Sequence, residues 1–215
     1  MERVMQVTDL KAKYKDEKVL CVANSDLKGI KKKVFGNTVK KLLKAIRKHG
    51  YFDYRYNAEK NFDEKQVIPY VVLRCGDKYF VTERIKGDSR LIGKLSVAVG
   101  GHINPCDVMD ESNMDYPELI VNCCIARELW EETTLDFGKI QHKEFITTFI
   151  DYSEEVSKCH VCLLTVIDLI DEDVEVKETD KLAGHWYTKD EINDRFQSLE
   201  NWSQIAFALL TGGEQ

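Results

Sequence analysis

Three carboxylates in one short segment have a spacing that could support metal chemistry. Glu128, Glu131 and Glu132 lie together within residues 127–132. At about 100° per residue, Glu131 lies about 60° to one side of Glu128 and Glu132 about 40° to the other, so a helix would present all three on one side. Like charges at these spacings repel by roughly 0.2–0.5 kcal/mol per pair. A bound divalent cation would remove that repulsion.

Carboxylate oxygens in such a group suit Mg²⁺ or Mn²⁺, which prefer octahedral oxygen coordination and commonly bridge protein carboxylates to substrate phosphates. Such a metal polarises a phosphoryl oxygen and lowers the pKa of an attacking water. An acidic protein could thereby bind an acidic, phosphorylated small molecule. The alternative is a solvated, glutamate-rich helix in which Arg127 compensates Glu131 at i,i+4.

Charge and hydropathy narrow the classes of function. The chain has 215 residues, an apolar content of 43% and a formal net charge of -6, which argues against a general nucleic-acid binder. No run approaches the roughly 20 apolar residues that span a bilayer, and the charged start is unlike a signal peptide, so we expect a cytoplasmic protein. Residues 28–49 are basic with apolar positions at helical spacing. This pattern predicts an amphipathic helix ended by Gly50, and an RNA or polyphosphate contact is the alternative.

The cysteines do not form a recognisable framework. There are seven, an odd number, and reduced thiols are expected. Cys159 and Cys162 are separated by two residues, but they fall in a predicted strand, where alternation would place the sulfurs on opposite faces. Without a second such pair to complete four ligands, these sulfurs do not predict a zinc site.

The elements around the carboxylates alternate between strand and helix. Apolar, β-rich runs at 67–75 and 79–85 are joined by Gly76-Asp77, a hairpin signal. Further strands are predicted at 95–99, about 144–151 and 159–170. Helices are predicted at 117–133, near 189 and at about 202–210. This order predicts an α/β/α sandwich around a mixed sheet, with residues 1–62 as an α/β extension and 63–215 as the catalytic domain.

The carboxylate helix needs an apolar face with which to pack. Leu119, Ala126 and Trp130 cluster about 180° from Glu128. We therefore expect the helix to lie on the sheet through these three residues.

In this context the segment resembles the Nudix box, whose core reads Arg-Glu-aliphatic-any-Glu-Glu. Arg127, Glu128, Leu129, Glu131 and Glu132 fill these places, and the preceding strand ends in Gly100-Gly101 as in many members. The resemblance covers roughly residues 67–210, including a Trp followed by a short helix at 186–192. It implies the Nudix fold, Mg²⁺ or Mn²⁺ as cofactor and cleavage of a diphosphate linkage.

The resemblance also implies roles for individual residues. Glu128, Glu131 and Glu132 would be metal ligands, Arg127 would orient a glutamate, and Gly101 beside Gly100 would leave room for metal and diphosphate. A general base could be one of these glutamates, or could come from Glu154 and Glu155 in a loop. The phosphates could be held by residues near the strand ends: Arg84, Lys86, Arg90 and His102.

Three departures distinguish this chain from the box. The loop at 102–116 is lengthened, Leu119 stands where the box has its first Glu with Glu118 one residue earlier, and Thr134 replaces the final Gly. Glu118 also fits a capping box with Asp115.

The expected substrate is a nucleoside diphosphate linked to another group, attacked at phosphorus by water. The first alternative is a non-catalytic Nudix-fold binding or regulatory module. The second is an isoprenyl diphosphate isomerase, for which Cys106 is the cysteine near the loop. The sequence does not decide the oligomeric state, and a homodimer is one alternative.

Overall fold

A computed structural model of the chain describes residues 7–30, 38–86, 92–110, 114–154 and 156–212. Contacts divide the chain into two compact units. Unit 1 comprises residues 1–69, 102–124 and 147–163, and unit 2 comprises residues 70–101, 125–146 and 164–215. The two units are described separately below. Among the described residues, no helix combines the length and apolarity that crossing a membrane requires.

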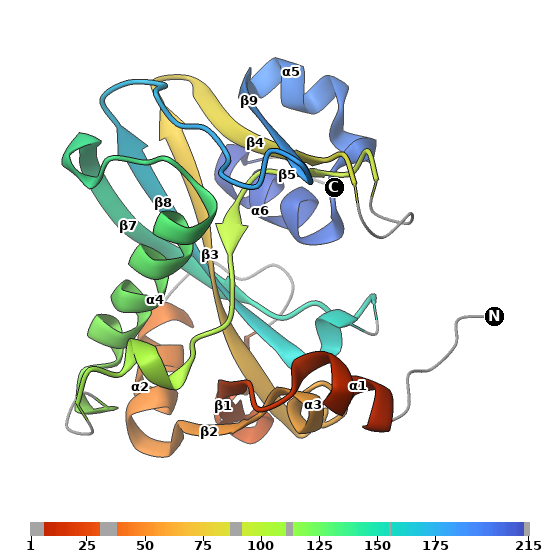
Figure 1. The fold of residues 1–215 in the computed structure, drawn as a ribbon. Coiled ribbons are helices and arrows are strands. Elements are labelled where there is room, and N and C mark those ends of the chain that lie inside the picture. Colours follow the sequence, from red (N-terminus) through yellow and green to blue (C-terminus); the bar gives the residue numbers. More distant parts are fainter. Residues whose placement is uncertain (1–6, 31–37, 87–91, 111–113, 155, 213–215) are drawn as a thin grey trace. The chain divides into compact units, whose positions relative to one another are not determined.

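The secondary structure is a mixture of helices and strands (Figure 1). The strands are β1 (Lys18–Ala23), β2 (Tyr51–Tyr54), β3 (Glu64–Cys75), β4 (Lys78–Arg84), β5 (Leu95–Ser96), β6 (Val99–Gly100), β7 (Ile140–Phe149), β8 (His160–Leu169) and β9 (Leu182–Thr188). The α-helices are α1 (Val7–Tyr14), α2 (Thr38–His49), α3 (Arg55–Ala58), α4 (Pro117–Glu132), α5 (Lys189–Asp194) and α6 (Asn201–Thr211). These elements confirm the predicted α/β class.

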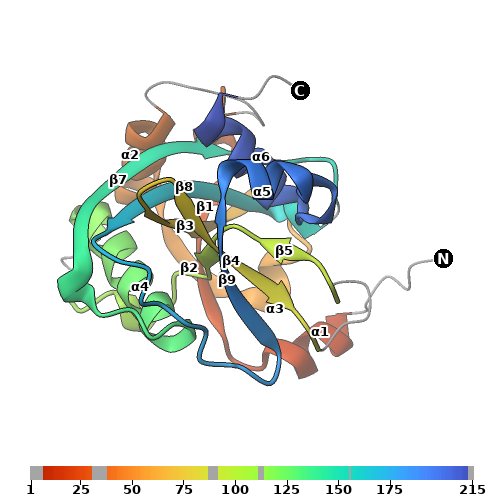
Figure 2. The ribbon, with the colours of Figure 1, turned by 90° about the horizontal axis from the view of Figure 1, so that it is seen from above.

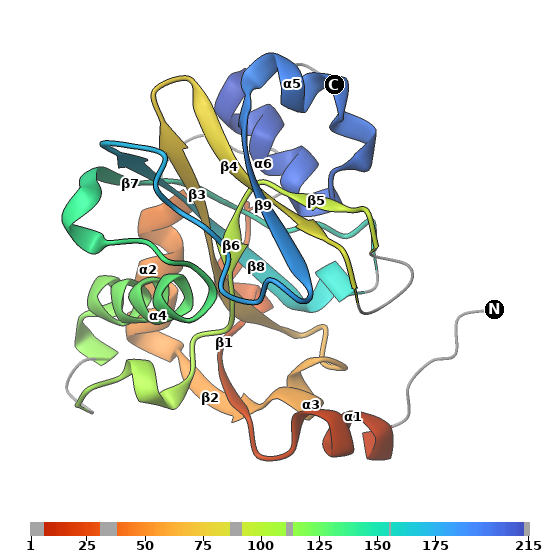
Figure 3. The ribbon, with the colours of Figure 1, turned by 45° about the horizontal axis from the view of Figure 1, so that its top comes forward.

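In unit 1, β1 pairs antiparallel with β2 and with the start of β3. Helix α2 contacts β1, and α1 lies beside α3 (Figures 1 and 3). The amphipathic character predicted for α2 is confirmed, because Leu42 and Ile46 are fully buried while Lys44 and Arg47 are exposed. The helix ends at His49, where Gly50 approaches the Ile46 carbonyl so closely that a Cβ would lie 2.5 Å from its oxygen.

In unit 2, β4 pairs antiparallel with the end of β3, with β5 and with the whole length of β9, while β6 pairs with β3. The predicted hairpin is present, and Gly76 adopts a φ of 59° at its turn. An isolated parallel bridge joins Leu95 to Leu199. Helix α6 packs its Phe207 ring against Tyr79, 5.8 Å between centroids, and α5 follows β9 directly (Figure 2).

Strand β9 was absent from the sequence prediction. Its sequence contains Gly184 and His185 and lacks a clear apolar alternation. The strand is nonetheless paired with β4 over seven residues, and a Cβ at Gly184 would come within 2.8 Å of the Phe80 ring. Tertiary pairing therefore outweighs local propensity in this segment.

The face through which α4 packs was predicted wrongly. Trp130 is 65% exposed, Leu119 is 42% exposed and Ala126 is also exposed. The buried face consists of Pro117, Ile120, Val121, Cys124, Ile125 and Leu129. Ile125 and Leu129 lie about 60° and 100° from Glu128 around the helix, so the apolar face adjoins the carboxylates instead of opposing them.

Candidate metal and phosphate site

The three glutamates occupy the last turns of α4 in unit 2, and Arg127 contacts two of them. Arg127 Nη1 donates to Glu128 Oε1 at 2.8 Å and to Glu131 Oε2 at 3.2 Å. The Glu128 side chain is 13% exposed, whereas that of Glu131 is 48% exposed. Arg127 therefore contacts one largely buried and one accessible carboxylate.

Gly101 lies directly beneath the Glu128 carboxylate. A Cβ at this position would be 2.1 Å from Glu128 Oε1, which is far inside van der Waals contact. Only glycine therefore permits this approach of side chain to backbone. Gly100 beside it pairs with Tyr70 in the β3–β6 ladder.

The pKa of Glu132 is strongly perturbed by its surroundings. Burial, followed by the negative charges of Glu128 and Glu178, raises its pKa to about 7, while Arg84 acts in the opposite direction. The burial has a geometric cause, because Glu132 lies about 40° from Glu128, beside the buried position Ile125 at about 60°. Accumulated negative charge with little solvent is the environment in which a hard divalent cation is favoured.

Arg84 ends β4 and supplies the nearby positive charge. Its Nε is buried and has no hydrogen-bond partner among the residues that the structure describes. A buried donor without an acceptor costs about 1–3 kcal/mol, so an arginine in this state is suited to an anionic ligand. This observation supports the phosphate-binding role predicted for Arg84.

The end of α4 shows how the helix stops without the glycine of the Nudix box. Thr133 forms a bridge with Val176, and the Thr134 N–H donates to the Glu175 carbonyl at 2.9 Å. The Lys177 N–H in turn donates to the Glu132 carbonyl at 2.8 Å. The backbone of residues 175–177 therefore satisfies the Glu132 carbonyl, one of those that a helix end leaves without an intrahelical partner.

The same segment leads to Glu178, a residue near Glu132 that was not predicted from the sequence. Glu178 follows Lys177 directly and adds a fourth negative charge near Glu132. It lies 46 positions beyond Glu132 in an irregular stretch, so no spacing rule connects the two. The exposed Trp130 ring is covered by Lys177 Nζ at 4.6 Å from its centroid.

Other predicted residues fall in unit 1 or outside the described part of the chain. His102 belongs to unit 1, where its Nε2 is 3.3 Å from His160 Nε2. Glu154 is exposed in the loop before β8. Glu155 and Arg90 lie outside the described residues. Cys159 closes a short 3-10 turn before β8 begins, so strand alternation does not govern its orientation relative to Cys162.

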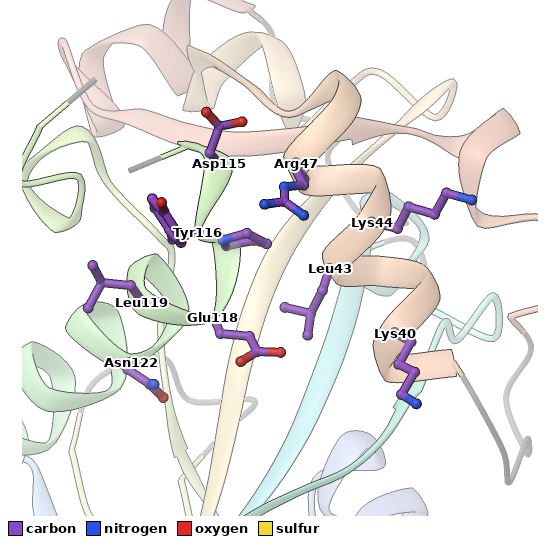
Figure 4. A pocket seen from close by; sticks show the side chains of 10 residues that line it. Lys40, Leu43, Lys44, Arg47, Asp115, Tyr116, Glu118, Leu119 and Asn122 are labelled. Carbon is purple, nitrogen blue, oxygen red and sulfur yellow. The ribbon is translucent and has the colours of Figure 1, made fainter. Parts of the chain in front are cut away.

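A cavity of about 560 Å³ in unit 1 is formed between α2 and the start of α4 (Figure 4). Basic residues of α2, Lys40, Lys44 and Arg47, line it together with Asp115 and Glu118. Glu118 is the predicted substitute for the first Glu of the box, and its side chain lines this cavity. Glu128, Glu131 and Glu132, at the other end of α4, do not line it.

Substituting Gly101 by Ala tests the contact with Glu128. The clash involves the far end of a flexible side chain, so Glu128 can move aside and the free energy of unfolding should change by less than about 1 kcal/mol. A displaced carboxylate should nevertheless reduce metal-dependent turnover at least about tenfold. Gly138→Ala is the matched control, because a Cβ at Gly138 would lie 3.2 Å from Asp136 Oδ1 in an exposed turn. Equal activity of the two variants would contradict the role of this contact.

Comparison with known proteins agrees with this arrangement. No family profile matches the chain. Protein YmaB of Bacillus subtilis (strain 168) is 34% identical over 161 residues, which are 73% of this chain and 76% of YmaB. The crystal structure of Tm1382, described as a candidate Nudix hydrolase, superposes with a TM-score of 0.76 at 26% identity, covering 91% of this chain and 99% of Tm1382.

The NUDIX domain of Shewanella oneidensis NrtR complexed with ADP ribose is more distantly similar, with a TM-score of 0.45 at 17% identity. The similarity covers 68% of this chain and 82% of that one.

The fold and the sequence resemblance together define the class of protein. The chain belongs to the Nudix hydrolase superfamily, in one family with YmaB.

Proposed function

We propose that this chain is a Mg²⁺- or Mn²⁺-dependent hydrolase that cleaves the diphosphate linkage of a nucleoside diphosphate joined to another group. The observation that carries the proposal is the grouping of carboxylates at the end of α4, where Arg127 joins Glu128 to Glu131. Burial and the charges of Glu128, Glu178 and Glu131 raise the pKa of Glu132 in the same group to about 7. We further propose that residues 63–215 form the catalytic domain, that residues 1–62 are an extension, and that the protein acts in the cytoplasm.

The residues at the end of α4 fit a hard divalent cation. Glu128, Glu131 and Glu132 would hold it through carboxylate oxygens, the ligands that Mg²⁺ and Mn²⁺ prefer. When bound, such a metal supplies Lewis-acid polarisation of a phosphoryl oxygen and lowers the pKa of water.

Each protein group contributes a separate part of the chemistry. Arg127 fixes the positions of Glu128 and Glu131 through its two charge-assisted hydrogen bonds. Arg84 can donate its buried Nε–H to a phosphate oxygen and balance the charge of the diphosphate. The general base is either a glutamate of α4 or Glu154.

The test is turnover of a substrate panel by the full chain in Mg²⁺. The panel contains nucleotide sugars, ADP-ribose, dinucleoside polyphosphates and nucleoside triphosphates, and released phosphate-containing products are quantified with and without chelator. We expect chelator-sensitive hydrolysis of at least one nucleoside diphosphate derivative. Saturable binding of panel members without turnover would instead establish a binding module, and the hydrolase proposal would be abandoned.

A further inference from the structure

A second group of metal-ligating side chains, which includes none of the α4 glutamates, lies within unit 1. His102 follows β6, His160 opens β8 and Glu59 caps α3, and one ligand atom from each lies within 4.8 Å of the other two. His160 is 7% exposed and the Glu59 side chain 11% exposed. Three segments distant in sequence therefore converge on one partly buried point.

The separation of the two imidazoles is informative. His102 Nε2 and His160 Nε2 are 3.3 Å apart. Two nitrogens bound to one tetrahedral Zn²⁺, each at about 2.0–2.1 Å, are about 3.3 Å apart. Two facing nitrogens at this distance need either a shared proton or a cation between them, because two lone pairs would repel.

Neighbouring side chains orient the His160 ring and the Glu59 carboxylate through hydrogen bonds, as residues around a metal site commonly orient its ligands. His160 Nδ1 is 3.4 Å from Cys159 Sγ, and Gln66 Nε2 donates to that sulfur at 3.5 Å. When Nδ1 carries the proton, His160 Nε2 presents its lone pair toward His102. Arg55 Nε donates to Glu59 Oε1 at 3.2 Å and so positions the carboxylate.

We propose that His102, His160 and Glu59 form a site for a transition-metal dication of the zinc class. Two imidazoles and one carboxylate are a ligand set typical of Zn²⁺ sites that keep a fourth position open, whereas Mg²⁺ prefers oxygen ligands alone. The site does not depend on the diphosphate hydrolase activity and is tested separately from it.

The alternative to a metal site is a part-buried pair of histidines that share one proton. It accounts for the 3.3 Å separation equally well, and the Glu59 carboxylate is then held by Arg55 Nε at 3.2 Å and the Cys159 thiol at 3.8 Å. It also predicts no affinity for a metal. Metal binding by the intact chain therefore separates the two explanations.

The experiment is a Co²⁺ titration of the chelator-treated full chain in excess Mg²⁺, which occupies oxygen-only sites. We expect one equivalent of Co²⁺ to give the visible absorption of tetrahedral cobalt, and equimolar Zn²⁺ to abolish it. Glu59→Gln and His102→Gln should each weaken binding by more than tenfold, since even outer-shell changes cost about 10–100-fold. Gln at position 59 keeps an oxygen for Arg55, so the fold should persist by circular dichroism.

Two control variants should bind Co²⁺ as the parent chain does. His49 has a carboxylate partner, Asp26, at 3.0 Å, so His49→Gln tests binding by an exposed histidine beside a single carboxylate. Glu132→Gln tests whether the metal is held by α4 instead. The proposal is overturned if the parent chain shows no saturable tetrahedral spectrum, or if Glu59→Gln and His102→Gln bind as tightly as His49→Gln.

Discussion

Glu132→Gln is expected to lower Mg²⁺-dependent turnover by on the order of 10² or more. The change keeps the side-chain size but removes one negative charge from the group that would hold the metal. Metal activation supplies several kcal/mol of transition-state stabilisation, and each loss of about 1.36 kcal/mol is tenfold in rate. Initial rates on the substrate identified from the panel, measured over a range of Mg²⁺ concentrations, check this result.

Stability without metal should move in the opposite direction. Burial and the charges of Glu128, Glu178 and Glu131 raise the Glu132 pKa to about 7, and Arg84 only partly offsets them. The folded chain therefore binds a proton more tightly than the unfolded chain, and this group costs stability as pH rises from about 4.5 to 7. In chelator at pH 8, Glu132→Gln should be more stable than the parent by on the order of 1 kcal/mol, with no gain at pH 4.

Glu118→Gln is the matched control, because Glu118 is an exposed glutamate at the other end of the same helix. It should leave both turnover and metal-free stability unchanged. Wild-type turnover and unchanged Mg²⁺ dependence in Glu132→Gln would exclude α4 from the mechanism.

Leu129→Ala is expected to destabilise the fold by about 2–5 kcal/mol, whereas Trp130→Ala should cost only about 0.5–1 kcal/mol. Leu129 is fully buried, so its truncation leaves a cavity. Trp130 is 65% exposed and contributes mainly its contact with the Lys177 ammonium. Urea unfolding of both variants at 25 °C gives the two free energies.

The two residues are neighbours in the chain, so each variant serves as the other's control. A larger loss for Trp130→Ala would restore the helix face that the sequence suggested and contradict the packing described here.

The error in the helix face has a general physical origin. Placing Leu119, Ala126 and Trp130 inward assumes that charged residues lie opposite the core. In this helix the buried positions Ile125 and Leu129 instead lie on the same side as Glu128 and Glu132. Amphipathic patterning therefore identifies helix α4 but does not decide its orientation.

Features encoded locally were predictable. The turn at Gly76, the basic face of α2 and the grouping of Glu128, Glu131 and Glu132 each depend on residues a few positions apart. The pairing of β9 with β4 depends instead on contacts across about 100 residues. The same is true of Glu178 beside Glu132, which only tertiary structure brings together.

The way α4 ends couples two distant parts of the chain mechanically. Thr134 stands where the Nudix box has a glycine, so α4 does not end in a glycine turn. The backbone of residues 175–177 binds the end of the helix instead. A single proteolytic nick in that stretch would release the Glu132 carbonyl and carry Glu178 away from the carboxylates in one event. Insertions in this stretch would displace the backbone groups that bind the end of α4. The length of the stretch is therefore constrained even though its side chains are largely exposed.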